Sequence, residues 1–253
     1  MIREKLVLAV RWVRNFTREK FHSKNENLPY YVTILTSTIV FVLALYTFLE
    51  LTDELAENEL QGVDSAVTAF VLSLRSHELT IFFTFMTHLG DPYAYVIVTL
   101  LIAGFFLIKE VSWKFILQTV LVLGLATLSN VGLKRVIGRS RPTIEHLVSV
   151  DTLSYPSGHS MSAMAFYGFL VYLCLRLRIS PWLRYVLTTI LVVIILCIGA
   201  SRVYLGVHFP SDVAAGFIGG LIWVAFCSII FSLIDLWRMR AAIEKERLKG
   251  GGS

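Results

Sequence analysis

Three short stretches of the sequence contain the residue types that phosphate chemistry uses. They are KRVIGRSRP at 134–142, YPSGH at 155–159 and SRVYLGVHFPSD at 201–212. A phosphate ester is negatively charged, and its displacement develops further charge on the oxygens, so catalysis depends on positioning and electrostatic stabilisation. Lys and Arg supply that stabilisation, and His can attack phosphorus or donate a proton. If they converge in space, the three stretches could form a site for phosphoryl transfer.

The cations of these stretches predict a phosphate-binding cage. Lys134, Arg141 and Arg202 are its expected members. The planar guanidinium of arginine matches two phosphate oxygens, whereas lysine acts as a point charge. A cluster that binds lipid headgroups is the alternative interpretation of these charges taken alone.

Pro156-Ser157-Gly158 directly precedes an apolar run, and this order predicts a helix N-terminus. The free N–H groups at such a terminus bind anions. The Ser157 hydroxyl would add a donor, and the small Gly158 would let the backbone approach the phosphate closely. Simple N-capping by Ser157 explains the same pattern equally well.

Two histidines are candidates for the chemical steps. Pro210 at a first helical position would place Asp212 in the first helical turn, close to His208. The carboxylate can hold one imidazole nitrogen protonated and leave the other as an electron-pair donor. His208 is then the expected nucleophile, forming a phosphohistidine, and His159 is the expected general acid for the leaving alcohol. The other histidines, His22, His77, His88 and His146, are expected to be structural.

The elements that carry these stretches are predicted to cross a membrane. Of 253 residues, 56% are hydrophobic and 16% are charged, and the mean hydropathy is +0.69. This composition excludes an ordinary soluble domain. A helix needs roughly 20 apolar residues to cross the hydrocarbon core. The predicted spans are 30–49, 92–108, 113–133, 159–177, 182–201 and 211–234.

The predicted fold is an all-α bundle of six transmembrane helices. Residues 65–90 are interrupted by Arg75, His77 and Glu78, which predicts one or two interfacial helices between the first two spans, with a seventh span as the alternative. Residues 2–21 have an apolar face surrounded by basic residues. They predict an amphipathic helix on an anionic membrane surface, or alternatively a solvated basic extension.

A single membrane domain is expected at 30–237. It is preceded by a basic cytoplasmic segment at 1–29 and followed by a tail at 238–253, whose final GGGS resembles an appended linker. The abundance of Lys and Arg in the first segment argues against a cleavable signal peptide. The three cysteines fall within predicted spans and are expected to be small apolar residues: Cys174, Cys197 and Cys227.

The distribution of basic residues predicts the orientation. All but six of the 23 Lys and Arg fall on the side that holds both termini, so this side is expected to be cytoplasmic. The first outer loop is acidic and includes Asp64. The six outward basic residues are Arg75, Lys134, Arg135, Arg139, Arg141 and Arg202. The three chemical stretches then share the extracytoplasmic face of the cell (inner or plasma) membrane.

The spacing of these residues resembles the complete three-part signature of the type 2 phosphatidic acid phosphatase superfamily. Lys134 is followed after six residues by Arg141-Pro142, then comes Pro156-Ser157-Gly158-His159, and Ser201-Arg202 is followed after five residues by His208 and after three more by Asp212. The resemblance covers 134–212 together with the six-helix layout, and it implies the same roles for both histidines. Arg135 and Arg139 lie outside the signature, so we expect them to meet headgroups or solvent.

The resemblance implies a membrane lipid phosphatase that hydrolyses a phosphate monoester or diphosphate. Bacterial members that act on phosphatidylglycerophosphate or undecaprenyl diphosphate are the most similar, and phosphatidate or the phosphate of a saccharolipid are further candidate substrates. A non-catalytic lipid-binding or transport protein is the alternative. A binder would need the cations but would have no use for His159, His208 and Asp212 together.

Neither a metal nor another cofactor is expected. The sequence has no HExxH or paired-cysteine motif, and the cations beside the predicted His and Asp cluster would repel a divalent ion. The expected partners are a phosphorylated membrane lipid and the bilayer, not nucleic acid. The sequence does not define the oligomeric state.

Overall fold

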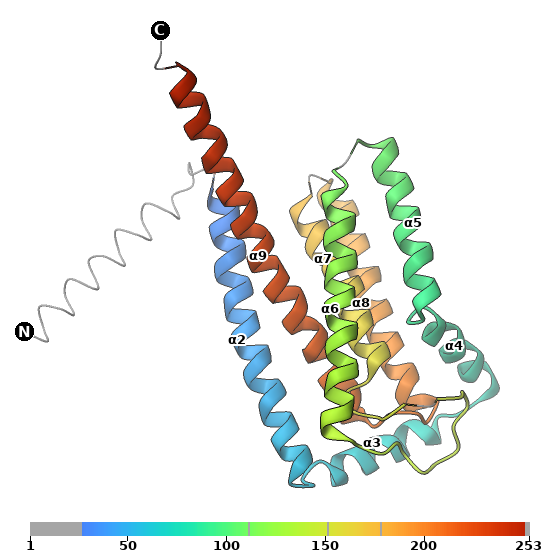
Figure 1. Cartoon of the computed structure of the whole chain (residues 1–253). Helices are drawn as coiled ribbons and strands as arrows, with labels where there is room; N and C mark the ends of the chain where they lie inside the picture. Colours follow the sequence, from blue (N-terminus) through green and yellow to red (C-terminus); the bar gives the residue numbers. More distant parts are fainter. Residues whose placement is uncertain (1–26, 111, 151, 178, 251–253) are drawn as a thin grey trace, which may run out of the picture. The chain divides into compact units, whose positions relative to one another are not determined.

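The computed structural model describes residues 27–110, 112–150, 152–177 and 179–250, of which 243–250 are described as backbone only. Every regular element in these ranges is an α-helix, which confirms the predicted fold class. The helices are α2 (Leu28–Ala56), α3 (Gln61–Ser73), α4 (His77–His88), α5 (Pro92–Ile108), α6 (Lys114–Ile137), α7 (Gly158–Arg176), α8 (Pro181–Tyr204) and α9 (Pro210–Gly250) (Figure 1). The amphipathic segment predicted at 2–21 lies outside the described residues.

The six predicted spans correspond to α2 and to α5 through α9. Five of these helices are long and apolar enough to cross a membrane, and α5 is an apolar helix of 17 residues. The helix α2 extends beyond the predicted end at 49, and α9 extends beyond 234. Hydropathy marks only the apolar part of a helix, whereas the backbone hydrogen bonds continue into polar sequence.

Residues 61–88 form two separate helices, α3 and α4, which meet at an angle of 120°. The break is fixed at both sides. Ser76 caps α4 by accepting a hydrogen bond from the Leu79 N–H, at 3.2 Å. Arg75 donates from Nε and NH2 to the carbonyl oxygen of Tyr204 at the end of α8, at 3.2 and 3.0 Å. The interrupted pattern therefore encodes a sharp bend instead of one straight span.

The chain forms two compact units. Residues 43–224 make the larger unit, and the chain up to Val42 together with the chain from Ala225 makes the smaller one. Within the smaller unit, the rings of Phe41 and Phe226 lie 6.0 Å apart, and Arg240 donates to the Tyr31 hydroxyl at 2.8 Å. All candidate site residues belong to the larger unit.

The central helix of the larger unit is α7, against which α6 and α8 pack. Its Ala163, Ala165 and Phe166 have no exposed surface. The first part of α9 approaches α7 through glycines, since a Cβ on Gly216 or Gly220 would lie only 2.6 or 2.5 Å from α7 or cap carbonyl oxygens. Small residues at a helix interface allow such close backbone contact, which supplies packing energy within a membrane.

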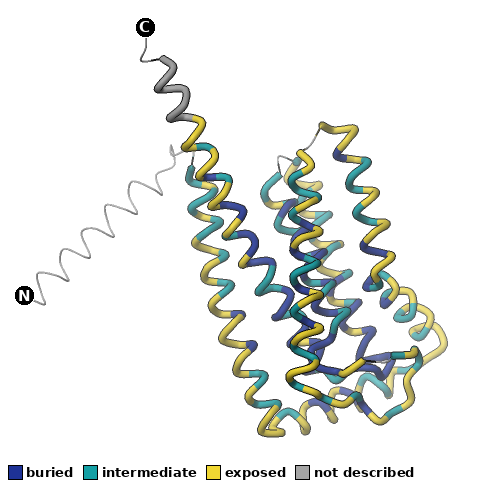
Figure 2. Tube along the Cα trace, in the orientation of Figure 1, coloured by how far each residue is buried: buried dark blue, intermediate teal, exposed yellow. Residues whose placement is uncertain are grey.

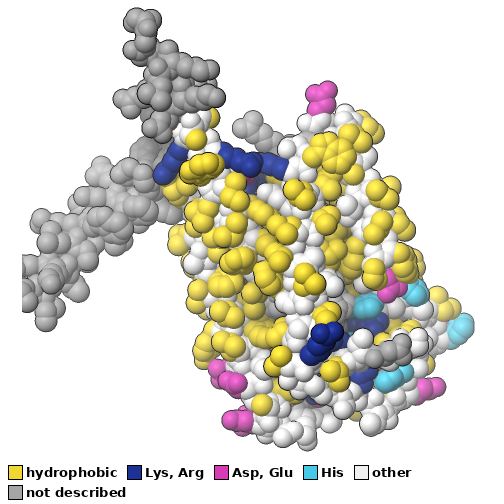
Figure 3. All heavy atoms as spheres, in the orientation of Figure 1, with side chains coloured by type: hydrophobic (Ala, Val, Ile, Leu, Met, Phe, Trp, Pro, Cys, Tyr) yellow, Lys and Arg dark blue, Asp and Glu magenta, His cyan; other side chains and the backbone are white. Residues whose placement is uncertain are grey.

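The outer surfaces of the helices are apolar. Leu100, Leu101, Leu117 and Leu128 are each at least 65% exposed. Figure 2 shows buried and exposed residues along each helix, and Figure 3 shows hydrophobic side chains over much of the visible face of the spans. An apolar surface of this extent requires lipid around it. The chain is therefore an integral membrane protein.

The close contact between α7 and α9 predicts the effect of adding a methyl group at Gly220. Gly220→Ala would push a Cβ into the Met161 carbonyl oxygen, and overpacking of this kind costs about 1–3 kcal/mol. We expect a lower thermal unfolding temperature in detergent. Gly124→Ala on α6 is the control, because a Cβ there meets nothing within 4 Å. Equal unfolding temperatures of the two variants would contradict the close-packing argument.

Candidate active site

The three chemical stretches converge at one end of the helices in the larger unit. The end of α6, the N-terminus of α7 and the connection between α8 and α9 meet there, with α3 running across them (Figure 1). Lys, Arg and His side chains gather at this end, beyond the hydrophobic surface of the spans (Figure 3). Residues separated by many positions in the sequence are thus brought into contact.

His208 and Asp212 form a buried pair at the start of α9. His208 Nδ1 lies 3.3 Å from Asp212 Oδ2, and the two side chains are 2% and 0% exposed. The same carboxylate oxygen accepts hydrogen bonds from the Phe209 backbone N–H, at 2.8 Å, and from the Ser154 hydroxyl. Ser154 has no distinctive spacing in the sequence, and sequence reasoning did not identify it.

The contacts of His208 define which nitrogen carries its proton. Arg141 NH1 lies 3.2 Å from His208 Nε2. A guanidinium can only donate, so Nε2 must be the acceptor and must hold a free electron pair. The proton is then on Nδ1, which faces Asp212. Burial lowers the pKa of His208 to about 3, and Asp212 offsets this effect only in part. The imidazole is therefore neutral at neutral pH.

Lys134 and Arg141 converge on the segment before α7. Lys134 Nζ donates to Thr152 Oγ1 at 3.2 Å and to the Leu153 carbonyl oxygen. Arg141 donates from Nε to the Thr152 carbonyl oxygen and from NH1 to the Val207 carbonyl oxygen, both at 2.6 Å. These bonds hold two like charges close together, an arrangement that favours a bound anion.

Arg202 is buried at the end of α8, with 3% of its surface exposed. Its NH1 donates to Thr87 Oγ1 at 2.6 Å, while its Nε is buried without a hydrogen-bond partner among the described residues. A buried charged donor without an acceptor costs on the order of 1–3 kcal/mol or more. A bound anion could accept this N–H.

Ser157 and Gly158 begin α7. The Ser157 hydroxyl oxygen accepts hydrogen bonds from Ser160 N and Ser160 Oγ, at 3.4 and 2.9 Å, so it is the N-cap that the sequence left as one alternative. A Cβ at Gly158 would lie 3.1 Å from Asn130 Oδ1. Asn130 also donates to the Pro156 carbonyl oxygen at 3.1 Å, which fixes this turn to α6.

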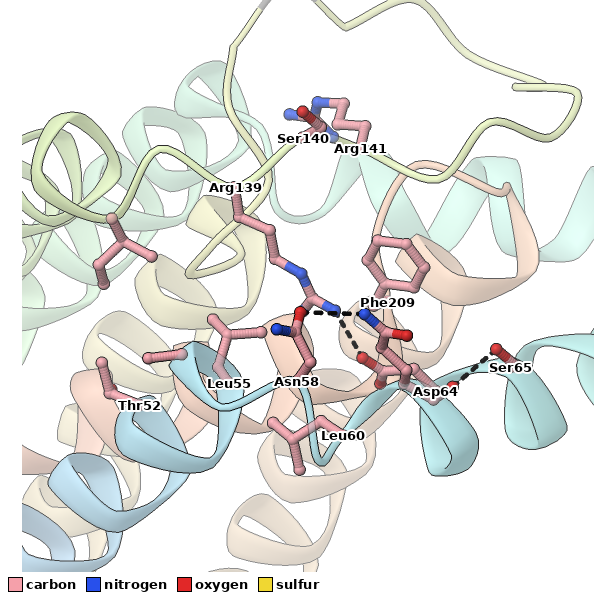
Figure 4. A pocket seen from close by; sticks show the side chains of 13 residues that line it. Thr52, Leu55, Asn58, Leu60, Asp64, Ser65, Arg139, Ser140, Arg141 and Phe209 are labelled. Atoms are coloured by element: carbon pink, nitrogen blue, oxygen red, sulfur yellow. Dashed lines mark hydrogen bonds and ion pairs between the residues drawn. The ribbon is translucent and has the colours of Figure 1, made fainter.

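The expectation for Arg139 is wrong. Its side chain is 15% exposed and forms ion pairs with Asp64 and Asp212, at 2.7 and 2.6 Å, instead of meeting headgroups or solvent. Figure 4 shows Arg139 pointing toward Asp64 beneath Phe209. Arg139 also donates to Ser211 Oγ at 2.7 Å. The cause is α3, which brings its Asp64, only 2% exposed, back to the start of α9.

His159 is linked to a carboxylate that sequence reasoning missed. Its Nε2 lies 3.0 Å from Asp91 Oδ1, and His88 Nδ1 lies 2.8 Å from Asp91 Oδ2. His88, which was expected to be structural, thus contacts the same carboxylate as His159. Asp91 follows Gly90 in a short turn, a pattern typical of an ordinary helix start, so the sequence offered no functional signal.

The remaining predicted residues keep simpler surroundings. Arg135 is exposed, one turn before Arg139. His146 lies 2.9 Å from the Pro142 carbonyl oxygen and donates to it, as a structural histidine does. His22 lies outside the described residues. Within the described ranges, no group of three or more His, Cys, Asp or Glu side chains could hold a metal ion.

Fold and site together define a polytopic membrane hydrolase for phosphate esters, and comparison with known proteins agrees. The PAP2 superfamily pattern matches residues 115–234. Phosphatidylglycerophosphatase B of Bacillus subtilis is 35% identical over 69% of this chain and 86% of its own. Lipid A 1-phosphatase of Rhizobium etli is 30% identical over 60% of this chain and 75% of its own.

A solved structure is also similar. The crystal structure of the PAP2-type phosphatidylglycerolphosphate phosphatase from Bacillus subtilis aligns with a TM-score of 0.70 at 33% identity, over 77% of this chain and 96% of that one. The chain therefore belongs to the PAP2 superfamily, as the resemblance of the three stretches implied. It is a membrane phosphatase, and the relatives named above are lipid phosphatases.

The ion pairs of Arg139 predict a large effect of removing its charge. Arg139→Met would leave the buried carboxylates of Asp64 and Asp212 without a cation, which typically destabilises a protein by about 3–5 kcal/mol. We expect a lower unfolding temperature and a loss of phosphatase activity of about tenfold or more, because Asp212 would no longer be held in place.

Arg135→Met is the matched control, since it removes an exposed arginine one turn away. We expect this variant to unfold at nearly the wild-type temperature and to keep its activity. Thermal unfolding and phosphate release would be measured on both variants in the same detergent. If the two variants behaved alike, Arg139 would have no special role.

Proposed function

We propose that the chain hydrolyses a phosphate monoester or diphosphate on a membrane lipid, at the extracytoplasmic face, through a phosphohistidine intermediate on His208. The observation that carries this proposal is the arrangement around His208. Its Nδ1 faces the buried Asp212 carboxylate, and its Nε2 accepts from Arg141, a side chain suited to binding phosphate. A neutral imidazole with its free electron pair beside a phosphate-binding cation is arranged for attack on phosphorus.

The phosphate would bind among Lys134, Arg141 and Arg202. Their charges balance the equatorial oxygens of the phosphoryl group, where negative charge develops during transfer. The unpartnered Nε of Arg202 supports this assignment, because a phosphate oxygen would supply the missing acceptor. Backbone N–H groups at the start of α7, beside Gly158, could complete the cage. The Ser157 hydroxyl is more important as the cap that shapes this turn.

The reaction would proceed in two steps. His208 Nε2 forms a bond to phosphorus as the bond from phosphorus to the leaving oxygen breaks, and His159 donates a proton to that oxygen. Water then attacks the phosphohistidine, the bond between phosphorus and nitrogen breaks, and His159 takes the proton that the water loses. The site needs no metal for either step, because the cations are its own side chains.

An apolar groove supports a lipid leaving group. It has a volume of about 530 Å³ and lies among α5, α6 and α7, with His159 and Gly158 at one end. Tyr95, Leu100 and Leu123 are among its apolar lining residues. A leaving alcohol protonated by His159 would extend into this groove, where a hydrocarbon chain is the favourable occupant.

The substrate class follows from the groove and from the relatives. Phosphatidylglycerophosphate and undecaprenyl diphosphate each join a phosphorylated headgroup to a long hydrocarbon, and phosphatidate does so as well. We rank the first two highest, since the Bacillus subtilis relative is a phosphatidylglycerophosphatase and a further relative, 29% identical over 57% of this chain, is the undecaprenyl-diphosphatase of Sulfolobus acidocaldarius. Phosphate release from a panel of these lipids in detergent micelles would order the three.

The proposed roles of the two histidines predict different kinetic defects. His208→Ala should lose activity on every substrate and form no trapped phosphoenzyme. His159→Ala should lose about 10²–10⁴-fold in kcat on a lipid alkyl phosphate, whose leaving oxygen needs a proton. The same variant should retain much of its activity on p-nitrophenyl phosphate, because nitrophenolate leaves without a proton. Asp212→Asn should fall between them, with a poorly oriented imidazole.

Two results would reject these roles. Equal losses of kcat on the alkyl and nitrophenyl substrates in the His159→Ala variant would exclude it as the general acid. A phosphoenzyme trapped by rapid acid quenching of the His208→Ala variant would exclude that residue as the nucleophile. Wild-type protein quenched in parallel provides the positive control for trapping.

The distribution of Lys and Arg predicts the sidedness of the site. A cysteine at Thr143, an exposed position after Arg141, should react with an impermeant thiol reagent added to intact cells. Glu110→Cys, in the exposed connection between α5 and α6, is the control and should react only after the membrane is opened. Both variants would carry Ala at the native cysteines Cys174, Cys197 and Cys227. The reverse labelling pattern would show an inverted topology.

A further inference from the structure

Asp91 lies at the N-terminus of α5 but does not cap that helix with its side chain. It is the N-cap residue of α5, where an Asp side chain normally accepts a hydrogen bond from an N–H of the first turn. Its carboxylate makes no such bond. Oδ1 instead lies 3.0 Å from His159 Nε2, and Oδ2 lies 2.8 Å from His88 Nδ1. Both oxygens therefore face histidine nitrogens, and neither caps the backbone of the helix.

The turn that carries Asp91, together with the end of α4, is hydrogen-bonded to α7 and α8. The Tyr167 hydroxyl on α7 donates to the Leu89 carbonyl oxygen at 2.8 Å, and Arg202 on α8 donates to Thr87 at 2.6 Å. A Cβ on Gly90 would lie 2.9 Å from His159 Cδ2. The glycine therefore lets the turn approach the edge of the imidazole ring, which places the next residue beside Nε2.

Resting on the proposed function, we propose that Asp91 is a positioning residue for the general acid His159. Its carboxylate accepts the hydrogen bond from the Nε2–H of His159. Nδ1 is then the atom that transfers a proton to the leaving oxygen. His88 is the second donor to the carboxylate and holds its orientation. Asp91 does not touch the substrate in this arrangement, and it acts only through His159.

The ring geometry supports this assignment of the two nitrogens. The edge of His159 formed by Cδ2 and Nε2 faces the turn, at Gly90 and Asp91. In an imidazole ring Nδ1 lies opposite the bond between Cδ2 and Nε2, so it is the nitrogen that these two contacts leave for proton transfer. His159 also lines the apolar groove proposed for the leaving group. The pair of His159 and Asp91 uses the nitrogens in the opposite way to the pair of His208 and Asp212. In the latter pair, Nδ1 faces the carboxylate and Nε2 remains for attack.

The proton balance of the reaction fits a fixed Nε2 proton. In the first step the Nδ1 proton moves to the leaving oxygen as its bond to phosphorus breaks, and the imidazolium becomes neutral. In the second step Nδ1 accepts a proton from the attacking water, and the imidazolium is restored. The Nε2 proton stays on the imidazole ring, hydrogen-bonded to Asp91, through both steps, so the carboxylate stabilises the charged form of the acid without being consumed.

The charges around His159 explain why it needs an anionic partner. Burial is the largest effect that disfavours a positive charge on its ring, Arg202 from α8 and Lys134 from α6 add to this effect, and Asp91 is the carboxylate that favours the charge. Partial burial alone would raise the pKa of Asp91, but hydrogen bonds from His159 and His88 lower it well below its usual range. The nearby Tyr93 hydroxyl lowers the pKa of Asp91 further. Asp91 is therefore ionised at neutral pH.

The test compares leaving groups in variants of intact protein in detergent. Asp91→Asn removes the charge with little change of shape. We expect kcat on phosphatidate to fall about 10–100-fold, within the general-acid contribution, with KM nearly unchanged and kcat on p-nitrophenyl phosphate reduced only a few fold. The alkaline limb of kcat on phosphatidate should move to lower pH, since the charged acid has lost its anionic partner.

Coupling to His159 is tested by the double variant. Asp91→Asn combined with His159→Ala should be no slower on phosphatidate than His159→Ala alone, because both changes remove the same proton donor. Asp91→Ser, which retains a side chain able to cap α5, repeats the comparison if the Asn variant unfolds at a lower temperature. His88→Gln should give a smaller loss on phosphatidate. His77→Gln, an exposed histidine at the start of the same helix, should change neither substrate.

The outcomes separate this inference from the proposed function. If Asp91→Asn lost kcat equally on both substrates while His159→Ala remained selective, Asp91 would be a purely structural residue and the inference would fail alone. Fully additive losses in the double variant would have the same meaning. If His159→Ala itself lost kcat equally on both substrates, the general acid of the proposed function would be wrong, and Asp91 would have no acid to position.

Discussion

The structure depends on one buried carboxylate, that of Asp212. It is completely enclosed, and a buried charge is tolerated only when it is paired and fully hydrogen-bonded. Its partners come from separate parts of the chain: Arg139 after α6, Ser154 before α7 and His208 after α8. Arg139 is in turn shared with Asp64 of α3. Satisfying this single group therefore fixes four segments at one end of the helices.

Hydrogen bonds to neutral oxygens orient the cations of the site. Lys134 and Arg141 both donate to the segment at Thr152 and Leu153, and Arg202 donates to the Thr87 hydroxyl. Carbonyl and hydroxyl oxygens orient a cation without cancelling its charge. Like charges oriented in this way raise the electrostatic potential of the site, and in the proposed mechanism that potential is what a phosphoryl group meets.

The sequence alone was sufficient to predict the spans and to identify candidate residues whose types are unusual in a membrane protein. His208, Asp212 and Arg202 stand out because charged and titratable residues between apolar runs need a reason. Arg139 was misjudged, and Asp64 was not identified as its partner, because their contact depends on the direction of α3. Hydropathy finds a helix but does not determine which neighbour it contacts, and these two residues are 75 positions apart.

Asp91 illustrates a different limit of sequence reasoning. An Asp directly before Pro92 is typical of an ordinary helix start. Helix capping therefore explains this Asp without any functional role. In the folded protein, however, the carboxylate does not cap its own helix and instead lies beside His159. In the proposed mechanism the acid and its anion then lie where the apolar groove meets the polar end of the helices. A lipid could thus keep its hydrocarbon within the bilayer while its phosphate reacts at the membrane surface, because the helices end there.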